Sequence, residues 1–352
     1  MTDRQTDRQT KLSCDHNIES FDTIDLLKFI GSILVFIMHL RLFADTNINL
    51  AIQLLARWCV PFFFITSSFF LFKNSDNGMI SAEKLSKYVK RIFFLYVSWL
   101  IINSPAILAN IYSKVIKGDL PLYWYIKNSF LCDTFLGSWF LLSSIFSACI
   151  LYLLCKRFKC WTILLISFPI YVICVLTSVY GNTLPDSLMY VLKDVLCFPL
   201  NIFGGFFYFS IGKCLADNYE RINGISKMSS CFFVAISYIV YCVEVVIAKK
   251  LDYLYSTDFS FSIAILGVSF VLLGITCGIK ISNHLLLRKM STIIYCAQAN
   301  VLEIRIIMES KLLHKDHDVF LLITMSLFMA GIVLFVLFMQ KRVKWKFLRY
   351  LS

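Results

Sequence analysis

Apolar segments long enough to cross a lipid bilayer recur along this chain, and no other feature constrains its fold so strongly. A span of the hydrocarbon core takes roughly 20 residues. Windows of this kind begin at ten places, near Ile24, Leu50, Ile92, Leu136, Trp161, Leu188, Ser229, Ser260, Ser291 and Val319. Of the 352 residues 59% are hydrophobic, more apolar surface than a water-soluble protein of this length buries in one core. The sequence therefore predicts an all-α integral membrane protein, a bundle of about ten transmembrane helices.

The charged residues indicate how such a bundle would be oriented. Basic clusters such as "KRFK" and "KISNHLLLRK" fall in alternate connections, whereas "ADTNIN" and "YGNTLPDS" contain no Lys or Arg. By the positive-inside rule this pattern places both termini in the cytoplasm, although "YSKVIKGDLPLYWYIKNSF" and "KKLDYLYSTD" on the predicted outer side also carry several Lys. The net charge of +12 is spread over these clusters and not along one face, so we predict a multi-pass protein of the cell membrane and no nucleic-acid partner.

The chain shows one division. Residues 1–20 are polar, contain a TDRQ repeat and lack the apolar core of a signal peptide, so we expect a disordered cytoplasmic tail. No linker divides residues 21–352, which we expect to form a single multi-pass membrane domain. The thirteen Cys are scattered, with no CxxC pair and no His at ligand spacing, so no metal site is predicted.

The first apolar segment, "IDLLKFIGSILVFIMHL", contains Lys28 and His39. Eleven helical steps return to within about 20° of the starting direction at a rise of roughly 16 Å, so both side chains lie on one stripe with Ser32 and Val35. Two explanations are open. Lys28 reaches the headgroups and His39 hydrogen-bonds a neighbouring helix, or the pair serves a ligand that is anionic at one end and reactive at the other.

The same segment resembles the signature of the membrane acyltransferase 3 family, whose usual form is DxLRxxAxxxVxxxH. Five later segments are similar to further family motifs, in the same order: "ARWCVPFFFITSSFFLF", "KYVKRIFFLYVSW", "GSWFLLSSI", "IFGGFFYFSIGKCL" and "MSTIIYCAQANVL". The chain departs from the family pattern at three positions. Lys28 stands where the family more often has Arg, Ser68 where Gly is usual, and Gln298 where His is frequent.

The resemblance implies a membrane O-acyltransferase that moves acetyl from acetyl-CoA to a hydroxyl of a cell-surface polysaccharide or lipid-linked glycan. Lys28, Lys90 and Arg91 would then neutralise the CoA phosphates. His39 would deprotonate the acceptor hydroxyl and Arg57 would stabilise the oxyanion, unless Arg57 only snorkels or pairs. Glu303, inside the ninth apolar segment, would orient His39 or neutralise Arg57. His284, His314 and His317 receive no role.

The expected partners are acyl-CoA, the glycan acceptor, membrane lipid and, unless the bundle completes the transfer alone, a separate extracytoplasmic protein. A transporter or flippase for a lipid-linked saccharide is the alternative, since charges in helices also line transport paths. That class predicts broken helices rich in Gly and Pro in two matching halves, but the chain has only 13 Gly and 6 Pro and no internal repeat. A polysaccharide polymerase would usually carry a large outer loop, and the longest predicted outer segment has roughly 20 residues.

Overall fold

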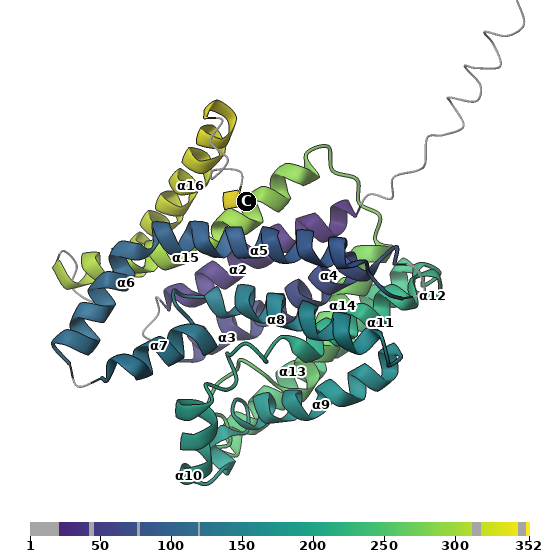
Figure 1. Cartoon of the computed structure of the whole chain (residues 1–352), viewed down its shortest axis with the longest axis horizontal. Coiled ribbons are helices and arrows are strands. Elements are labelled where there is room, and N and C mark those ends of the chain that lie inside the picture. The colour runs from purple at the N-terminus through teal and green to yellow at the C-terminus, as the bar shows by residue number, and fades with distance from the viewer. Residues whose placement is uncertain (1–20, 42–45, 76–77, 119, 312–317, 344–349) are drawn as a thin grey trace, which may run out of the picture.

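The computed structural model describes residues 21–41, 46–75, 78–118, 120–311, 318–343 and 350–352 (Figure 1). Within these ranges the chain is helical and contains no β-strand, which confirms the predicted all-α class. The elements are α2 (Asp22–Leu40), α3 (Thr46–Ala56), α4 (Cys59–Phe72), α5 (Ala82–Ile102), α6 (Ser104–Ile111), η1 (Tyr112–Ile116), α7 (Leu122–Leu131), α8 (Ser138–Cys155), α9 (Cys160–Leu176), η2 (Gly181–Thr183), α10 (Asp186–Met189), η3 (Tyr190–Val195), α11 (Phe206–Asp217), α12 (Tyr219–Asn223), α13 (Lys227–Lys250), α14 (Phe261–Thr276), α15 (His284–Lys311) and α16 (Asp318–Arg342). The predicted tail, residues 1–20, lies outside the described residues.

Membrane-spanning helices are present, in a smaller number than predicted. Five helical stretches of the described chain are long and apolar enough to cross a bilayer: Asp22–Leu40, Thr46–Phe72, Ser138–Cys155, Lys227–Lys250 and Val319–Arg342. A sixth is formed if α5 and the helix after its 65° bend count as one span, and α9 and α14 are apolar but shorter. The multi-pass character is thus supported, with five or six crossings by this criterion instead of ten.

The segment predicted to span from Leu188 is not one helix. Residues 186–195 form the short elements α10 and η3, residues 196–205 turn without a helix, and α11 begins only at Phe206. The physical reason lies in the sequence, because Lys193 and Asp194 interrupt the apolar run and Pro199 cannot donate a helical hydrogen bond.

Helix α2 packs along α15, and the two run in the same direction. Ser291 Oγ near the start of α15 donates to the Lys28 carbonyl at 2.9 Å, and Arg305 Nη1 further along donates to the Leu40 carbonyl. The predicted first helix is therefore confirmed as one continuous element. The end of the bundle where α2 begins is called the Lys28 end below, and the end where α2 finishes is called the His39 end.

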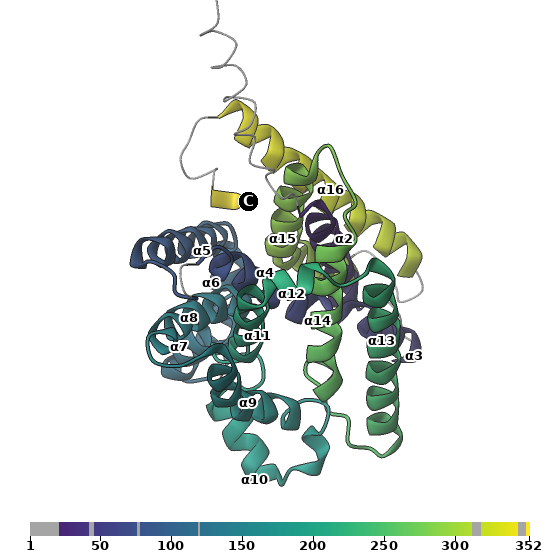
Figure 2. The same ribbon diagram turned by 90° about the vertical axis from the view of Figure 1, so that its right-hand side faces the viewer.

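Helix α4 lies near the centre of the bundle (Figure 2), and 11 of its 14 residues are buried. Its contact with α11 depends on a small residue, because a Cβ atom at Gly212 would lie 2.3 Å from the Ile65 carbonyl oxygen. Ser68, which stands in place of the family's glycine, is fully buried and donates to the Phe209 carbonyl at 2.6 Å. This hydroxyl bonds α4 to α11, so the departure from the family motif is accommodated by the packing.

A break between α3 and α4 positions the second predicted site residue. Pro61 has no N–H to donate to the Arg57 carbonyl, so the helical bond expected there is missing and the chain turns at Arg57 and Trp58. A similar break at Asn103, just before Pro105, separates α5 from α6; Asn103 Nδ2 donates to the Trp99 carbonyl at 2.7 Å. Such side-chain bonds satisfy backbone groups that a kink frees inside a membrane.

Candidate functional site

Lys28 and His39 lie on one face of α2, as the helical spacing predicts, and both are half-buried. Ser32 and Val35 of the same stripe are 0% and 1% exposed, so the stripe faces the interior of the bundle and not the lipid. Lys28 Nζ lies 5.2 Å from the centre of the Phe70 ring at the end of α4. The two ionisable groups therefore sit roughly 16 Å apart along a packed helix face.

A network of charges joins α2 to α15 at the Lys28 end. The Asp25 carboxylate, 1% exposed, accepts two hydrogen bonds from Arg288, at 2.9 and 2.8 Å, and lies 2.9 Å from His284 Nδ1. Asp22 accepts from the backbone N–H of Ile281 at 2.8 Å. This network holds α2 and α15 in register one helical turn from Lys28.

No residue of this network is among the predicted site residues. Asp25 stands in the quoted family signature three residues before Lys28, and this position is its signal in the sequence. His284, which receives no role from the sequence, is the first residue of α15 and contacts Asp25. Both residues are positioning groups for the helix that carries Lys28 and His39.

The other two residues predicted to bind the cofactor, Lys90 and Arg91, are both exposed on α5. The charge of Arg91 acts on the Lys28 ammonium group, as do those of Asp25 and Arg288. Among the described residues no hydrogen bond or ion pair joins Lys90 or Arg91 to Lys28, so their shared role at the cofactor stays a prediction.

At the His39 end, Arg57 is held by the loop that precedes α14. Its Nη1 forms an ion pair with Asp258, and its Nε donates to Thr257 Oγ1 at 3.0 Å. Thr257 in turn donates to Gln53 Oε1 at 2.5 Å. The charges of Arg57 and Asp258 both act on the His39 imidazole. The structure therefore pairs Arg57 with Asp258, whose only sequence signal is its place just before an apolar segment. Among the described residues no hydrogen bond joins Arg57 to His39, and their joint action stays a prediction.

Glu303 does not neutralise Arg57, because Asp258 fills that role. Glu303 is half-buried on α15 and forms no hydrogen bond or ion pair with any residue that the structure describes. Its neighbour Arg305 binds the Leu40 carbonyl beside His39. The remaining prediction for Glu303, that it orients His39, stays a prediction.

A carboxylate from α13 fixes the loop that carries Asp258. Glu244 accepts from the backbone N–H groups of Phe261 and Ser262, both at 2.8 Å, and from the Tyr180 hydroxyl at 3.1 Å. These N–H groups belong to the first turn of α14, where a helix leaves donors unpaired and favours negative charge. The capped first turn begins three residues after Asp258, so Glu244 limits the movement of the ion pair at the His39 end.

Two motifs far apart in the chain meet between α8 and α15. The Tyr295 hydroxyl donates to the Gly137 carbonyl at 3.1 Å. Gly137 has a φ of +82°, and a Cβ atom there would lie 3.0 Å from Gln298 Nε2. Gln298 is fully buried, and both atoms of its amide lack a hydrogen-bond partner among the described residues. This unpaired amide is a polar group that the sequence analysis noted only as a departure from the family.

Asp133 lies beside this meeting point. Its Oδ1 accepts from the Trp139 N–H at 2.8 Å and from the Ser138 hydroxyl at 3.1 Å, which caps the start of α8. Burial raises the pKa of the Asp133 carboxyl to about 6, against the opposing effect of these hydrogen bonds. The group therefore titrates just below neutral pH.

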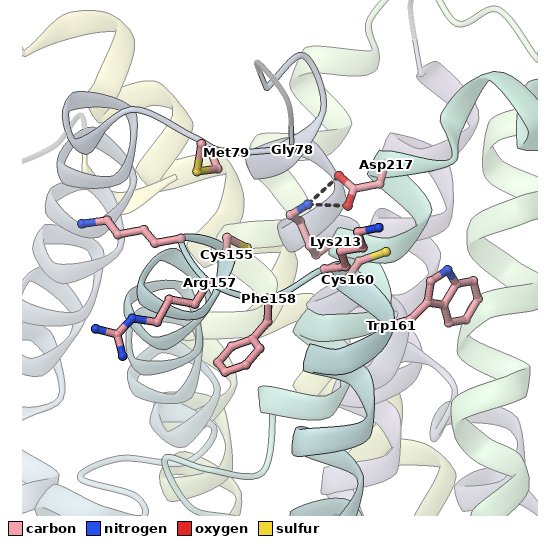
Figure 3. A pocket seen from close by; sticks show the side chains of 11 residues that line it. Gly78, Met79, Cys155, Arg157, Phe158, Cys160, Trp161, Lys213 and Asp217 are labelled. Carbon is pink, nitrogen blue, oxygen red and sulfur yellow. Dashed lines mark hydrogen bonds and ion pairs between the residues drawn. The ribbon is translucent and has the colours of Figure 1, made fainter.

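The described part of the bundle also contains the following two cavities. One, of about 470 Å³, lies where the α8–α9 turn meets the end of α11; Figure 3 shows Arg157 and Phe158 projecting from that turn and the Lys213–Asp217 pair on α11. The other, of about 340 Å³, is lined almost wholly by apolar side chains of α2, α15 and α16. Among the described residues no group of three or more His, Cys, Asp or Glu side chains is placed to hold a metal ion.

A family model and a protein of Enterococcus faecalis are similar to this chain. A family model described as an acyltransferase domain, acyltransferase 3, matches residues 21–340. A protein of Enterococcus faecalis named amino-acid racemase is 31% identical to the chain over 188 residues, which are 53% of this chain and 24% of the racemase. The chain thus spans about a quarter of the length of that relative. No solved structure matches it.

Proposed function

This chain belongs to the acyltransferase 3 family, and we propose that it is an O-acyltransferase that moves acetyl from acetyl-CoA to a hydroxyl of a cell-surface polysaccharide or a lipid-linked glycan. The observation that carries the proposal is the arrangement on α2. One face of this helix presents a cation at one end and, roughly 16 Å away, an imidazole on which the charge of Arg57 acts. An acyl-CoA is an extended molecule with the same arrangement, because its phosphates would lie near the cation and its thioester near the imidazole.

In the proposed reaction His39 is the general base. Neutral His39 takes the proton from the acceptor hydroxyl while the hydroxyl oxygen attacks the thioester carbonyl. Arg57 stabilises the oxyanion of the tetrahedral intermediate. When the intermediate collapses, the C–S bond breaks and the CoA thiolate takes the proton from His39, so the products are an O-acetyl ester and free CoA.

Asp258 gives Arg57 a defined position in this scheme. A guanidinium has five N–H donors, and the contacts with Thr257 and Asp258 use the Nε and Nη1 groups. These contacts hold the guanidinium in one position, and such preorganised donors stabilise a developing negative charge.

The proposal places the Lys28 end in the cytoplasm of the cell membrane, where acetyl-CoA is available. Lys28 and Arg91 would neutralise phosphate groups of the donor, with Lys90 at the rim. A surface glycan, or a lipid-linked precursor of one, would reach His39 from the opposite side. A separate extracytoplasmic partner is required only if acetyl is handed on after it leaves this bundle.

The racemase relative does not change this proposal. The matched stretch is 24% of that protein, and racemisation is an activity of the whole protein that carries the name. The acyltransferase model, by contrast, covers residues 21–340 of this chain. We therefore assign acyl transfer and not racemisation to it.

The test supplies membranes containing the protein with acetyl-CoA and an envelope fraction, and measures CoA thiol release and O-acetyl ester on the glycan. Wild type should produce both, and His39→Ala should produce neither above background. Lys114→Ala, at an exposed position on η1 outside the site and both cavities, is the matched control and should behave as wild type. The transporter alternative is favoured instead if wild type releases no CoA with any envelope fraction while it moves a lipid-linked saccharide across the membrane.

A further inference from the structure

The cavity at the α8–α9 turn is built for an anion. Of its eleven lining residues, four are cationic and one, Asp217, is anionic. Three of the cations, Lys156, Arg157 and Lys159, are exposed on the turn. Only Lys213 is already paired with the acid, so the lining carries a surplus of positive charge that a polyanionic ligand would neutralise.

The floor of the cavity is rigid. Lys213 is 3% exposed, and its Nζ lies 2.5 Å from both carboxylate oxygens of Asp217 on the next turn of α11. Gly78 covers this pair with a φ of +74°, and a Cβ atom there would lie 3.1 Å from Lys213 Nζ. A glycine at this positive φ lets the backbone pack directly over the ion pair, so the pair is held in place beneath Gly78.

Aromatic rings stand beside the cations. Phe158 and Trp161 line the cavity and are 42% and 63% exposed, and Figure 3 shows them projecting from the turn and from the start of α9. Aromatic faces stack on purine bases, and the volume of about 470 Å³ is within the range of small-molecule sites. A cavity lined by both groups suits a nucleotide, because cations bind its phosphates and aromatic rings stack on its base.

The cavity and Lys28 lie at the same end of the bundle, on two sides of α4. Phe70 and Phe72 are two residues apart in the last turn of this helix. Lys28 Nζ lies 5.2 Å from the first ring and Lys213 Nζ lies 5.4 Å from the second. A ligand that is long relative to the width of one helix, about 10 Å, can therefore reach from the cavity toward α2.

We propose that the cavity formed by the α8–α9 turn, Gly78 and the end of α11 binds the 3′-phospho-ADP part of the acyl-CoA donor. The proposal rests on the proposed function for the identity of the donor. Phosphates would lie on Lys156, Arg157 and Lys159, and the adenine would stack on Trp161. The headgroup of an anionic phospholipid shares the phosphate chemistry, so the test separates the two ligands.

Native cysteines report on the occupancy of the cavity. Cys155 and Cys160 line it and are half-buried, whereas Cys231 is exposed on α13. The full chain in phosphatidylcholine nanodiscs is alkylated with a maleimide, with and without desulfo-CoA, which has no thiol to exchange with these residues. At ten times its dissociation constant, desulfo-CoA should slow labelling of Cys155 and Cys160 about tenfold and leave Cys231 unchanged.

Variants locate the phosphate contacts. Lys159→Glu should raise the desulfo-CoA concentration for half-protection about tenfold, because one charge-assisted hydrogen bond is replaced by repulsion. Lys159→Gln removes the charge without adding a negative one and should show a smaller rise, so the test still stands if the glutamate variant folds poorly. Lys114→Glu, exposed on η1 and outside the cavity, should leave protection as in wild type.

The labelling results either support the nucleotide site or overturn it. Protection that Lys159→Glu weakens supports the site, even if no acyl transfer is found, in which case the proposed function fails and the nucleotide site stands. Absence of protection in a preparation that transfers acetyl overturns the site and leaves the function intact. Labelling that slows in phosphatidylglycerol nanodiscs but not with desulfo-CoA also overturns it, because the cavity then binds a lipid headgroup.

Discussion

The guanidinium of Arg57 and the carboxylate of Asp258 form an ion pair across 201 residues of sequence, and both charges act on the imidazole of His39. The pair joins the break between α3 and α4 to the loop before α14. Its side chains are only 13% and 16% exposed, so neither charge is well solvated without the other. The same two side chains therefore connect distant segments of the fold and hold the proposed oxyanion group in place.

The ion pair should respond to mutation as a unit. Arg57→Gln or Asp258→Asn alone leaves a poorly solvated charge without its partner and should lower the stability by about 1–3 kcal/mol, less than for a fully buried pair. The double variant should recover most of this loss, and thermal unfolding of the purified protein in detergent measures it. Acetyl transfer should stay low in the double variant, since Arg57 is also the proposed oxyanion group. Additive losses of stability would show that the two side chains are not coupled.

His39 should control chemistry and not donor binding. Loss of a general base typically lowers the rate by about 10²–10⁴-fold, so His39→Gln should lower kcat by this order while the KM for acetyl-CoA stays close to that of wild type. Radiolabelled acetyl transfer in proteoliposomes gives both constants. A His39→Gln protein with a normal kcat would remove His39 from the proposed mechanism.

Lys28 should act on the donor through its charge. Lys28→Arg keeps the charge and should remain active, whereas Lys28→Glu places a carboxylate near Arg91 and Arg288 and should raise the KM for acetyl-CoA at least about tenfold. The matched control is Lys114→Glu, at an exposed position on η1 away from the Lys28 end. Equal activity of the arginine and glutamate variants would exclude Lys28 from the donor site.

Helical periodicity predicted those features of the site that depend on a single helix. Helical spacing was enough to place Lys28 and His39 on one face, because the direction of a side chain on a continuous helix depends only on its position. The burial of Ser32 and Val35 between them then follows from that face. The same spacing cannot predict how two helices meet, so the network around Asp25 and His284 was missed.

The sequence did not predict which residues of distant segments contact the site residues. Asp258 lies in a short loop whose place beside Arg57 depends on how α13 and α14 pack, and no periodicity records it. The basic turn "KRFK" was used only for orientation, because its charges have no visible partner until α11 brings Lys213 and Asp217 beside it. The broken sixth span was a misjudgement of a different kind. Its charges and Pro199 are visible in the sequence, and overall apolarity outweighed them in the prediction.

Asp133 should make stability depend on pH below neutrality. Its pKa is about 6 in the folded protein, above the usual value of 3.8, so the folded state favours the protonated carboxyl. This contribution to stability is complete below about pH 4 and is lost as the pH rises through 6. Asp133→Asn keeps an acceptor for the Trp139 N–H and should melt higher than wild type at pH 7.5, with little difference at pH 4.5. Parallel melting curves of the two proteins between pH 4 and 8 would contradict this assignment.

Gln298 should show opposite effects on stability and activity. Its buried amide has no partner among the described residues, and an unsatisfied buried polar group costs about 1–3 kcal/mol, so Gln298→Leu should unfold at a higher temperature than wild type. We expect acetyl transfer to fall about tenfold in the same variant, because an amide kept at this cost between the α8 and α15 motifs is explained by a bond to substrate.

The histidine variant separates the two effects of Gln298. Gln298→His restores the residue more frequent in the family and keeps a donor and an acceptor, so it should retain transfer while Gln298→Leu does not. Melting temperature and kcat/KM measured on the same preparations distinguish the cases. A leucine variant that is both more stable and fully active would show that the amide is a packing defect without a ligand, and the interior between α8 and α15 would then have no part in binding the donor.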